Sequence, residues 1–150
     1  MSGFRFAGTE SGADPAIRLM QLKDGESVTI NQMVCGSTAG TIAPASSAAG
    51  PTNLWGVAVD TQAESSGSYV YVIADQDALY YVSDASARYP GDTLSICDGG
   101  LTVTTAVGST LGSLEVVAIS DSTHETLVKI ADGCHVLSHT NATAGGSTIA

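Results

Sequence analysis

Short apolar runs separated by turn-forming residues make up most of this sequence, and the pattern is clearest over residues 88–130. A Pro-Gly-Asp sequence opens this segment at residues 90–92, and four apolar runs follow it. Asp-Gly-Gly at residues 98–100 separates the first two runs. Asp-Gly between alternating apolar residues is a strong short-range signal for a tight turn between antiparallel strands. The segment therefore predicts two consecutive hairpins, over residues 94–105 and 114–130.

The N-terminal half contains two further runs that predict a hairpin. In residues 27–33, Val28 and Ile30 alternate with polar neighbours, and this period of two residues is typical of a half-buried strand. The polar residues 23–26 separate this run from the apolar residues 17–22. We expect the two runs to pair as antiparallel strands.

The middle of the chain contains the most apolar run. Residues 69–74 are apolar throughout, which predicts a central strand covered on both faces. Asp-Gln-Asp at residues 75–77 predicts a tight turn into the next strand, residues 78–83. Four tyrosines are expected to interleave across this hairpin as cross-strand aromatic pairs: Tyr69, Tyr71, Tyr80 and Tyr81. Upstream, residues 54–60 predict another strand, with the single tryptophan, Trp55, near its start.

Residues 1–15 predict an N-terminal arm. Both phenylalanines of the chain, Phe4 and Phe6, flank Arg5 among small and polar residues. Two large rings in an isolated arm need to be covered, so we expect the arm to anchor on a neighbouring surface. The alternative is a strand that pairs locally, or a frayed terminus.

Residues 36–53 predict a long loop, because Ile42 is their only large apolar side chain. Loops of this length without secondary structure are uncommon in compact domains and tend to be functional or disordered. We expect the loop to contact a partner, and the alternative is a flexible surface loop without such a role. The polar residues 138–150 predict a tail outside the core.

The fold class follows from the absence of any helical period. About eight to ten short strands, spaced roughly 8–12 residues apart, predict an all-β fold: a small β-barrel or sandwich built of hairpins. A chain of 150 residues suits a single domain. The expected organisation is an arm at residues 1–15, a β domain at residues 16–137 and a tail at residues 138–150.

The charge balance excludes one class of partner. Fifteen acidic residues against five Lys and Arg give a net charge of -10, whereas binding nucleic acid through its phosphates needs a basic surface. The start of the chain lacks the apolar segment of a signal peptide, and no run approaches the roughly 18 apolar residues of a membrane helix. We therefore expect synthesis in the cytoplasm and no membrane partner. The odd number and wide spacing of Cys35, Cys97 and Cys134 predict reduced thiols.

No catalytic motif is recognisable, so the sequence predicts a protein that is not an enzyme and that needs no cofactor or metal. Two metal sites are weak alternatives: the Asp-Gln-Asp turn at residues 75–77, and Cys134 with His135 and His139. Neither supplies a full ligand set. Gly-Val-Ala-Val-Asp at residues 56–60 is similar to an element of trimeric deoxyuridine triphosphatases, but the C-terminal tail lacks the arginine and phenylalanine of that family.

Five segments together carry a family resemblance. They are the N-terminal arm with few apolar residues, L-K-D-G-E-S-V-T-I at residues 22–30, the Ala/Gly/Ser/Pro-rich loop at residues 36–53, W-G-V-A-V-D at residues 55–60 and P-G-D-T-L-S-I at residues 90–96. With these segments, residues 16–130 resemble the head decoration, or cement, proteins of bacteriophages.

The resemblance implies a structural protein of the virion, bound to the outer capsid surface where subunits of the major capsid protein meet. It implies a homotrimer, or less often a dimer or monomer, and no catalysis. The arm and the long loop would be the contact surfaces, through Phe4, Arg5, Phe6, Ile42, Pro44 and Pro51. The alternative is a non-catalytic binding module, such as a phage tail or receptor-binding domain or a sugar-binding β domain that uses Trp55 and the tyrosines.

Overall fold

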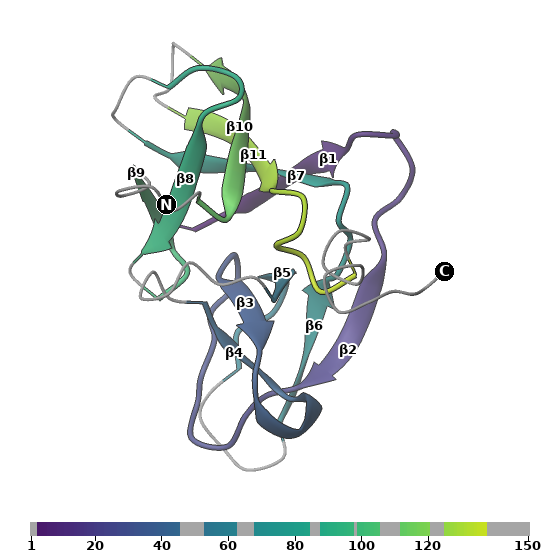
Figure 1. Cartoon of the computed structure of the whole chain (residues 1–150). Helices are drawn as coiled ribbons and strands as arrows, with labels where there is room; N and C mark the ends of the chain where they lie inside the picture. Colours follow the sequence, from purple (N-terminus) through teal and green to yellow (C-terminus); the bar gives the residue numbers. More distant parts are fainter. Residues whose placement is uncertain are drawn as a thin grey trace.

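The computed structural model describes residues 3–45, 53–62, 68–84, 88–97, 99–105, 112–120 and 125–137. In this part of the chain, eleven strands form two antiparallel sheets that pack against each other (Figure 1). The six-stranded sheet has the order β1 (Arg5–Thr9), β7 (Ala78–Ser83), β11 (Glu125–Ile130), β10 (Leu114–Ser120), β8 (Thr93–Cys97) and β9 (Thr102–Thr105). The five-stranded sheet has the order β2 (Ile17–Gln21), β6 (Tyr69–Ile73), β5 (Leu54–Ala58), β3 (Met33–Gly36) and β4 (Ile42–Pro44).

This architecture confirms the predicted all-β class. Of the two expected arrangements it is the sandwich, because two sheets pack against each other and neither of them closes into a barrel. The helical structure in the described residues is one short 3-10 turn, Thr38–Gly40, between β3 and β4.

Both hairpins predicted from the Asp-Gly and apolar patterns are present. β8 pairs with β9, with Ile96 opposite Val103, and β10 pairs with β11, with Val116 opposite Val128. The turn after β8 contains Gly99 at φ 67°, in the left-handed region that glycine adopts at little cost. These turns lie between strands that are adjacent in the chain, so the local sequence is sufficient to specify the pairing.

The hairpin predicted between residues 17–22 and 27–33 is wrong. β2 pairs with β6 instead, and residues 27–33 contribute the isolated bridge of Val28 to Gln62 before β3 begins. The polar turn after β2 carries the chain across the five-stranded sheet, where Leu22 and Val28 are both buried. Both side chains join the smaller buried cluster of this sheet.

The hairpin predicted between residues 69–74 and 78–83 is also wrong. β6 belongs to the five-stranded sheet and β7 to the six-stranded sheet, so the turn at residues 75–77 connects the two layers. The predicted tyrosine ladder is therefore not formed. Tyr69 and Tyr71 are exposed on β6, whereas Tyr80 is fully buried on β7.

The buried apolar side chains form two clusters on opposite faces of the five-stranded sheet. Val70 and Val72 belong to the smaller cluster and Ile73 to the larger, which lies between the two sheets. The larger cluster contains Phe4, Met33, Ala45, Leu54, Val57, Ile73, Ala78, Tyr80, Val82, Leu94, Ile96, Leu114, Val116, Val128 and Ile130. The smaller cluster contains Leu22, Val28, Val34, Ile42, Ala58, Val70 and Val72.

The predicted N-terminal arm is corrected by the position of β1. β1 pairs with β7 in the six-stranded sheet, and Phe4 just before it has no exposed surface. The Phe4 ring meets Tyr80 edge-on at 6.4 Å, and its backbone N–H donates to the carbonyl of Asn31 at 2.7 Å. The segment is a strand, as the alternative interpretation had it, but its partner β7 lies about seventy residues away along the chain. Phe4 is a core residue because its ring fills space between the sheets.

The predicted loop over residues 36–53 is corrected in its first part. β4 pairs with β3, and the only large apolar side chain of this stretch, Ile42, is fully buried in the smaller cluster. Residues 46–52, and the predicted tail at residues 138–150, lie outside the described part of the chain.

Candidate functional site

Four large apolar side chains are exposed together on adjacent strands β2 and β6. Ile17 and Leu19 are 53% and 54% exposed, and Tyr69 and Tyr71 are 52% and 49% exposed. Leu19 lies directly opposite Tyr71 in the antiparallel register, so these side chains point to the same side of the sheet. We call this surface, made of Ile17, Leu19, Tyr69 and Tyr71, the β2–β6 face.

The β2–β6 face continues the surface that forms the main core. Along β6, Tyr69, Tyr71 and Ile73 alternate with Val70 and Val72, so these three share one face of the strand. Ile73 is buried against the six-stranded sheet, whereas the two tyrosines are not covered. The inner face of the five-stranded sheet thus extends past the part that the six-stranded sheet covers, and its four exposed side chains there are apolar or aromatic. Contiguous surfaces of this kind are typical of interaction sites.

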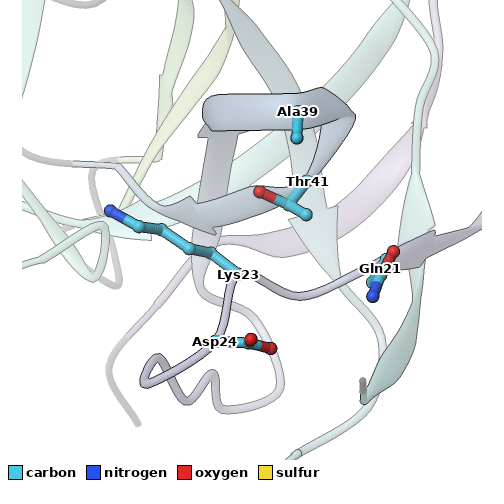
Figure 2. A pocket seen from close by; sticks show the side chains of 5 residues that line it. All are labelled: Gln21, Lys23, Asp24, Ala39 and Thr41. Atoms are coloured by element: carbon cyan, nitrogen blue, oxygen red, sulfur yellow. The ribbon is translucent and has the colours of Figure 1, made fainter. Parts of the chain in front are cut away.

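A polar pocket adjoins the β2–β6 face at the end of β2. It has a volume of about 350 Å³ and is lined by Gln21, Lys23, Asp24, Ala39 and Thr41, as Figure 2 shows. The Gln21 backbone lies opposite Tyr69, so this residue belongs to both the pocket and the strand pair that carries the face. The pocket gives the apolar surface a polar rim on one side, as is usual at protein interfaces.

The opposite face of the five-stranded sheet carries the single tryptophan. The guanidinium of Arg18 lies over the Trp55 ring, 5.4 Å from its centroid, and Trp55 packs against the smaller cluster. Trp55 therefore lies on the other side of the sheet from Tyr69 and Tyr71. The sugar site that would combine Trp55 with these tyrosines is not assembled, because the sheet itself separates them.

A buried histidine connects the chain after β11 to β5. The Nδ1 atom of His135 accepts the backbone N–H of Leu137 at 3.0 Å, so Nε2 carries the proton and donates to the carbonyl of Trp55 at 2.8 Å. Leu54 extends the connection: its N–H donates to the carbonyl of Cys134, and its carbonyl accepts the N–H of Val136, both at 2.9 Å. Burial lowers the pKa of His135 below its usual 6.5, and this favours the neutral ring that the two hydrogen bonds need.

In both metal sites considered from the sequence, side chains that could bind a metal are hydrogen-bonded to backbone groups instead. Both ring nitrogens of His135 are occupied by backbone groups, and His139 lies outside the described residues. The Asp75 carboxylate accepts the N–H of Ala16 at 3.1 Å and the N–H of Asp77 at 2.9 Å, which is the chemistry of a turn. In the described ranges, no three His, Cys, Asp or Glu side chains are placed to hold a metal ion.

The contact residues expected from the sequence are scattered. Phe4 and Ile42 are buried in different clusters. Arg5 forms an ion pair with Glu125 and Phe6 is 38% exposed. Pro44 lies in β4 opposite Val34, and Pro51 lies outside the described residues.

The β2–β6 face as a whole was not predicted: the sequence pointed to Tyr69 and Tyr71 only as members of a tyrosine ladder or a sugar site, and not to Ile17 or Leu19. Both Leu19 and its neighbour Met20 are apolar, so the sequence does not indicate which side of the strand faces the core. Only the pairing of β2 with β6, about fifty residues away along the chain, decides it.

Comparison with known proteins does not assign a family. No protein-family model matches the chain, and no curated protein matches it significantly.

The described residues contain no helix of the length and apolar character needed to cross a membrane.

Proposed function

We propose that this protein is a structural, non-catalytic decoration (cement) protein of a bacteriophage head, bound to the outer capsid surface through its β2–β6 face. The observation that carries the proposal is the exposure of Ile17, Leu19, Tyr69 and Tyr71 on one face of two adjacent strands. The resemblance of residues 16–130 to decoration proteins supplies the identity of the partner, the major capsid protein.

The chemistry of the face suits a protein partner. Tyrosine offers a large apolar ring with a hydroxyl that remains able to hydrogen bond, and it is enriched where interfaces are fully desolvated. The four side chains carry no charge, so covering them does not require an ion to lose its water. A partner surface that is apolar at its centre and polar at its rim would fit this arrangement.

The remaining surface suits a protein that must stay soluble until it assembles. The net charge of -10 keeps free copies apart. A homotrimer, as the resemblance implies, would present three β2–β6 faces to neighbouring capsid subunits at once. Individually weak contacts then add up through their high effective concentration. The rigid two-layer sandwich would hold the faces at fixed spacing.

The proposal is tested with empty, expanded shells assembled from the major capsid protein that this protein would decorate. Purified protein should co-sediment with the shells at a fixed ratio to capsid subunits and should raise their melting temperature. Shells that have not expanded serve as the comparison. Failure to co-sediment with either type of shell, with the protein folded, would refute the proposed function.

A further inference from the structure

β2 is an edge strand of the five-stranded sheet, and among the described strands it pairs with β6 alone (Figure 1). Directly after β2, Leu22 bridges to Ile42 of β4 and the N–H of Lys23 donates to the Ile42 carbonyl at 2.9 Å, so the edge available for pairing is limited to β2 itself. Two hydrogen bonds show which residues on this side of the sheet turn their backbone groups toward β6. The N–H of Ala74 donates to the carbonyl of Ala16, and the N–H of Leu22 donates to the carbonyl of Ser68.

The alternation of an antiparallel ladder then determines the outer side of β2. Every second residue of an antiparallel strand turns its N–H and C=O groups toward the same neighbour. Ala16 and Leu22 turn these groups toward β6, so Arg18 and Met20, which lie between them at alternate positions, do the same. The N–H and C=O groups of Ile17 and Leu19 therefore point away from β6. They are the groups with which another extended chain could pair.

The basic side chains near this edge differ from the others of the protein in having no ion-pair partner among the described residues. Three of the five basic side chains are in ion pairs: Arg5 with Glu125, Arg88 with Asp84 and Lys129 with Glu10. The other two, Arg18 and Lys23, make no ion pair with a described residue, and both are exposed. Arg18 lies in β2 and Lys23 follows it by two residues. Acidic groups lie at both ends of the strand, because Asp24 follows Lys23 and the Asp75 carboxylate accepts the N–H of Ala16. Within β2 itself, Arg18 is the only charged side chain, so the strand carries a local positive charge in a protein of strongly negative charge.

We propose that the β2 edge accepts an extended strand of a partner protein, apolar at the alternate positions beside Leu19 and acidic at the positions beside Arg18. The main-chain groups of Ile17 and Leu19 supply the hydrogen bonds, and the two faces of β2 select the side chains. This deepens the proposed function, on which it rests for the source of the strand: a segment of the capsid subunit would lie at the margin of the β2–β6 face.

A second copy of this chain fits the edge less well. Two-fold antiparallel pairing about Leu19 would bring the Arg18 side chains of the two copies into a diagonal relation on one face, about 7–8 Å apart. Like charges in that relation are unfavourable, and each copy carries a net charge of -10. An acidic strand replaces this repulsion with attraction.

The probe is a fluorescein-labelled heptapeptide of alternating Val and Glu, and the control peptide alternates Val and Lys. Fluorescence anisotropy should show saturable binding of the Val/Glu peptide and about tenfold weaker binding of the Val/Lys peptide. The Arg18→Glu variant should reverse this preference. Equal binding of the two peptides, or no saturable binding of the Val/Glu peptide up to about 1 mM, overturns the proposal.

A matched pair of variants isolates the backbone contribution. Ile17→Pro removes the outward N–H at the first residue of β2, a position where an edge strand tolerates proline, and Ile17→Val keeps that N–H. Ile17→Pro should bind the peptide at least about tenfold more weakly than Ile17→Val. If Ile17→Pro does not fold, the charge reversal by Arg18→Glu remains decisive.

The same variants separate this inference from the proposed function. Wild-type protein that co-sediments with shells, together with Ile17→Pro that co-sediments equally well, overturns strand addition and leaves the capsid role intact. Peptide binding with the expected preference but no binding to shells overturns the capsid role and leaves strand addition intact. A self-associated form that Ile17→Pro dissociates would show that a second copy occupies the edge, and it overturns the proposal.

Discussion

Leu19 and Tyr71 lie directly opposite each other on β2 and β6, and about half of each side chain is exposed. Two residues after Tyr71 in β6, on the same face of the strand, Ile73 is buried between the two sheets. The contrast arises because the six-stranded sheet covers only part of the inner surface of the five-stranded sheet. We propose that the uncovered part is the surface that binds another protein.

The Phe4 ring should contribute strongly to stability, although it precedes the first strand. Phe4→Ala removes a fully buried ring and should lower the free energy of unfolding by about 3–5 kcal/mol in urea denaturation. Phe6→Ala is the control: Phe6 is 38% exposed and should cost less than half as much. Deletion of residues 1–15 should unfold the domain, because it also removes β1. A stable, folded deletion variant would contradict the assignment of Phe4 to the core.

Gly56 should be irreplaceable because another backbone lies against it. A Cβ at Gly56 would be 1.7 Å from the carbonyl oxygen of Ile73, and φ is 144°. Gly8 has nearly the same φ, 141°, but a Cβ there would meet nothing within 4 Å. Gly8→Ala should therefore cost about 1–3 kcal/mol through backbone strain alone, and Gly56→Ala should cost several kcal/mol more or prevent folding. Equal losses in the two variants would contradict the close approach of β5 and β6.

The hydroxyl of Tyr80 is buried and makes no hydrogen bond with any residue that the structure describes. Burial also raises the pKa of this phenol above its usual value of 10. Since an unpaired buried hydroxyl is unfavourable, Tyr80→Phe should raise the free energy of unfolding by about 1 kcal/mol. Thermal denaturation of the two proteins at pH 7 measures the difference. A loss of stability of similar size would show that the hydroxyl has a partner.

The pairing of residues 134–137 with β5 should weaken in acid. Burial lowers the pKa of His135 below 6.5, so between the folded-state pKa and 6.5 the unfolded chain binds a proton that the folded chain does not. The contribution of His135 to stability is then complete above pH 6.5 and decreases as pH falls. A proton on Nδ1 also removes the acceptor for the N–H of Leu137.

The measurement is the urea unfolding free energy of wild type and of His135→Gln at several pH values between 7.5 and 5. The difference between the two proteins should shrink toward low pH. Asp75 and Arg18 are the charged groups that act on this ring, with opposite effects, and both are unchanged in the variant. A difference that stays constant across this range would contradict a neutral, buried His135.

The pairings that the sequence predicted correctly are those between strands adjacent in the chain. Asp-Gly-Gly at residues 98–100 separates β8 from β9, and the short polar stretch of residues 121–124, which begins with Asp121, separates β10 from β11, so a few neighbouring residues are enough to predict each pairing. The same reasoning failed for the turn at residues 75–77, which connects the two sheets. The Asp75 carboxylate stabilises this turn by accepting the N–H groups of Ala16 and Asp77. A turn sequence indicates that the chain changes direction, but it does not say which sheet the next strand joins.

The candidate site depends on information that is not local. β2 meets β6, and β1 meets β7, across long stretches of sequence. Ile17, Leu19 and Met20 are all apolar, so their order along the strand does not reveal which of them remains exposed. Phe4 was expected to be an anchor because small residues surround it, but the space that it fills is formed by strands far away in sequence.

The most direct test of the account compares shell binding by Leu19→Ser/Tyr71→Ser with that by Tyr89→Ser, which removes an exposed ring from the six-stranded side. All three substituted side chains are exposed, so both variants should remain folded by circular dichroism. The double variant should bind expanded shells at least about tenfold more weakly than wild type, since apolar and aromatic side chains at the centre of an interface carry most of its binding free energy. Tyr89→Ser should bind as wild type does. Undiminished binding by the folded double variant would contradict the assignment of the β2–β6 face.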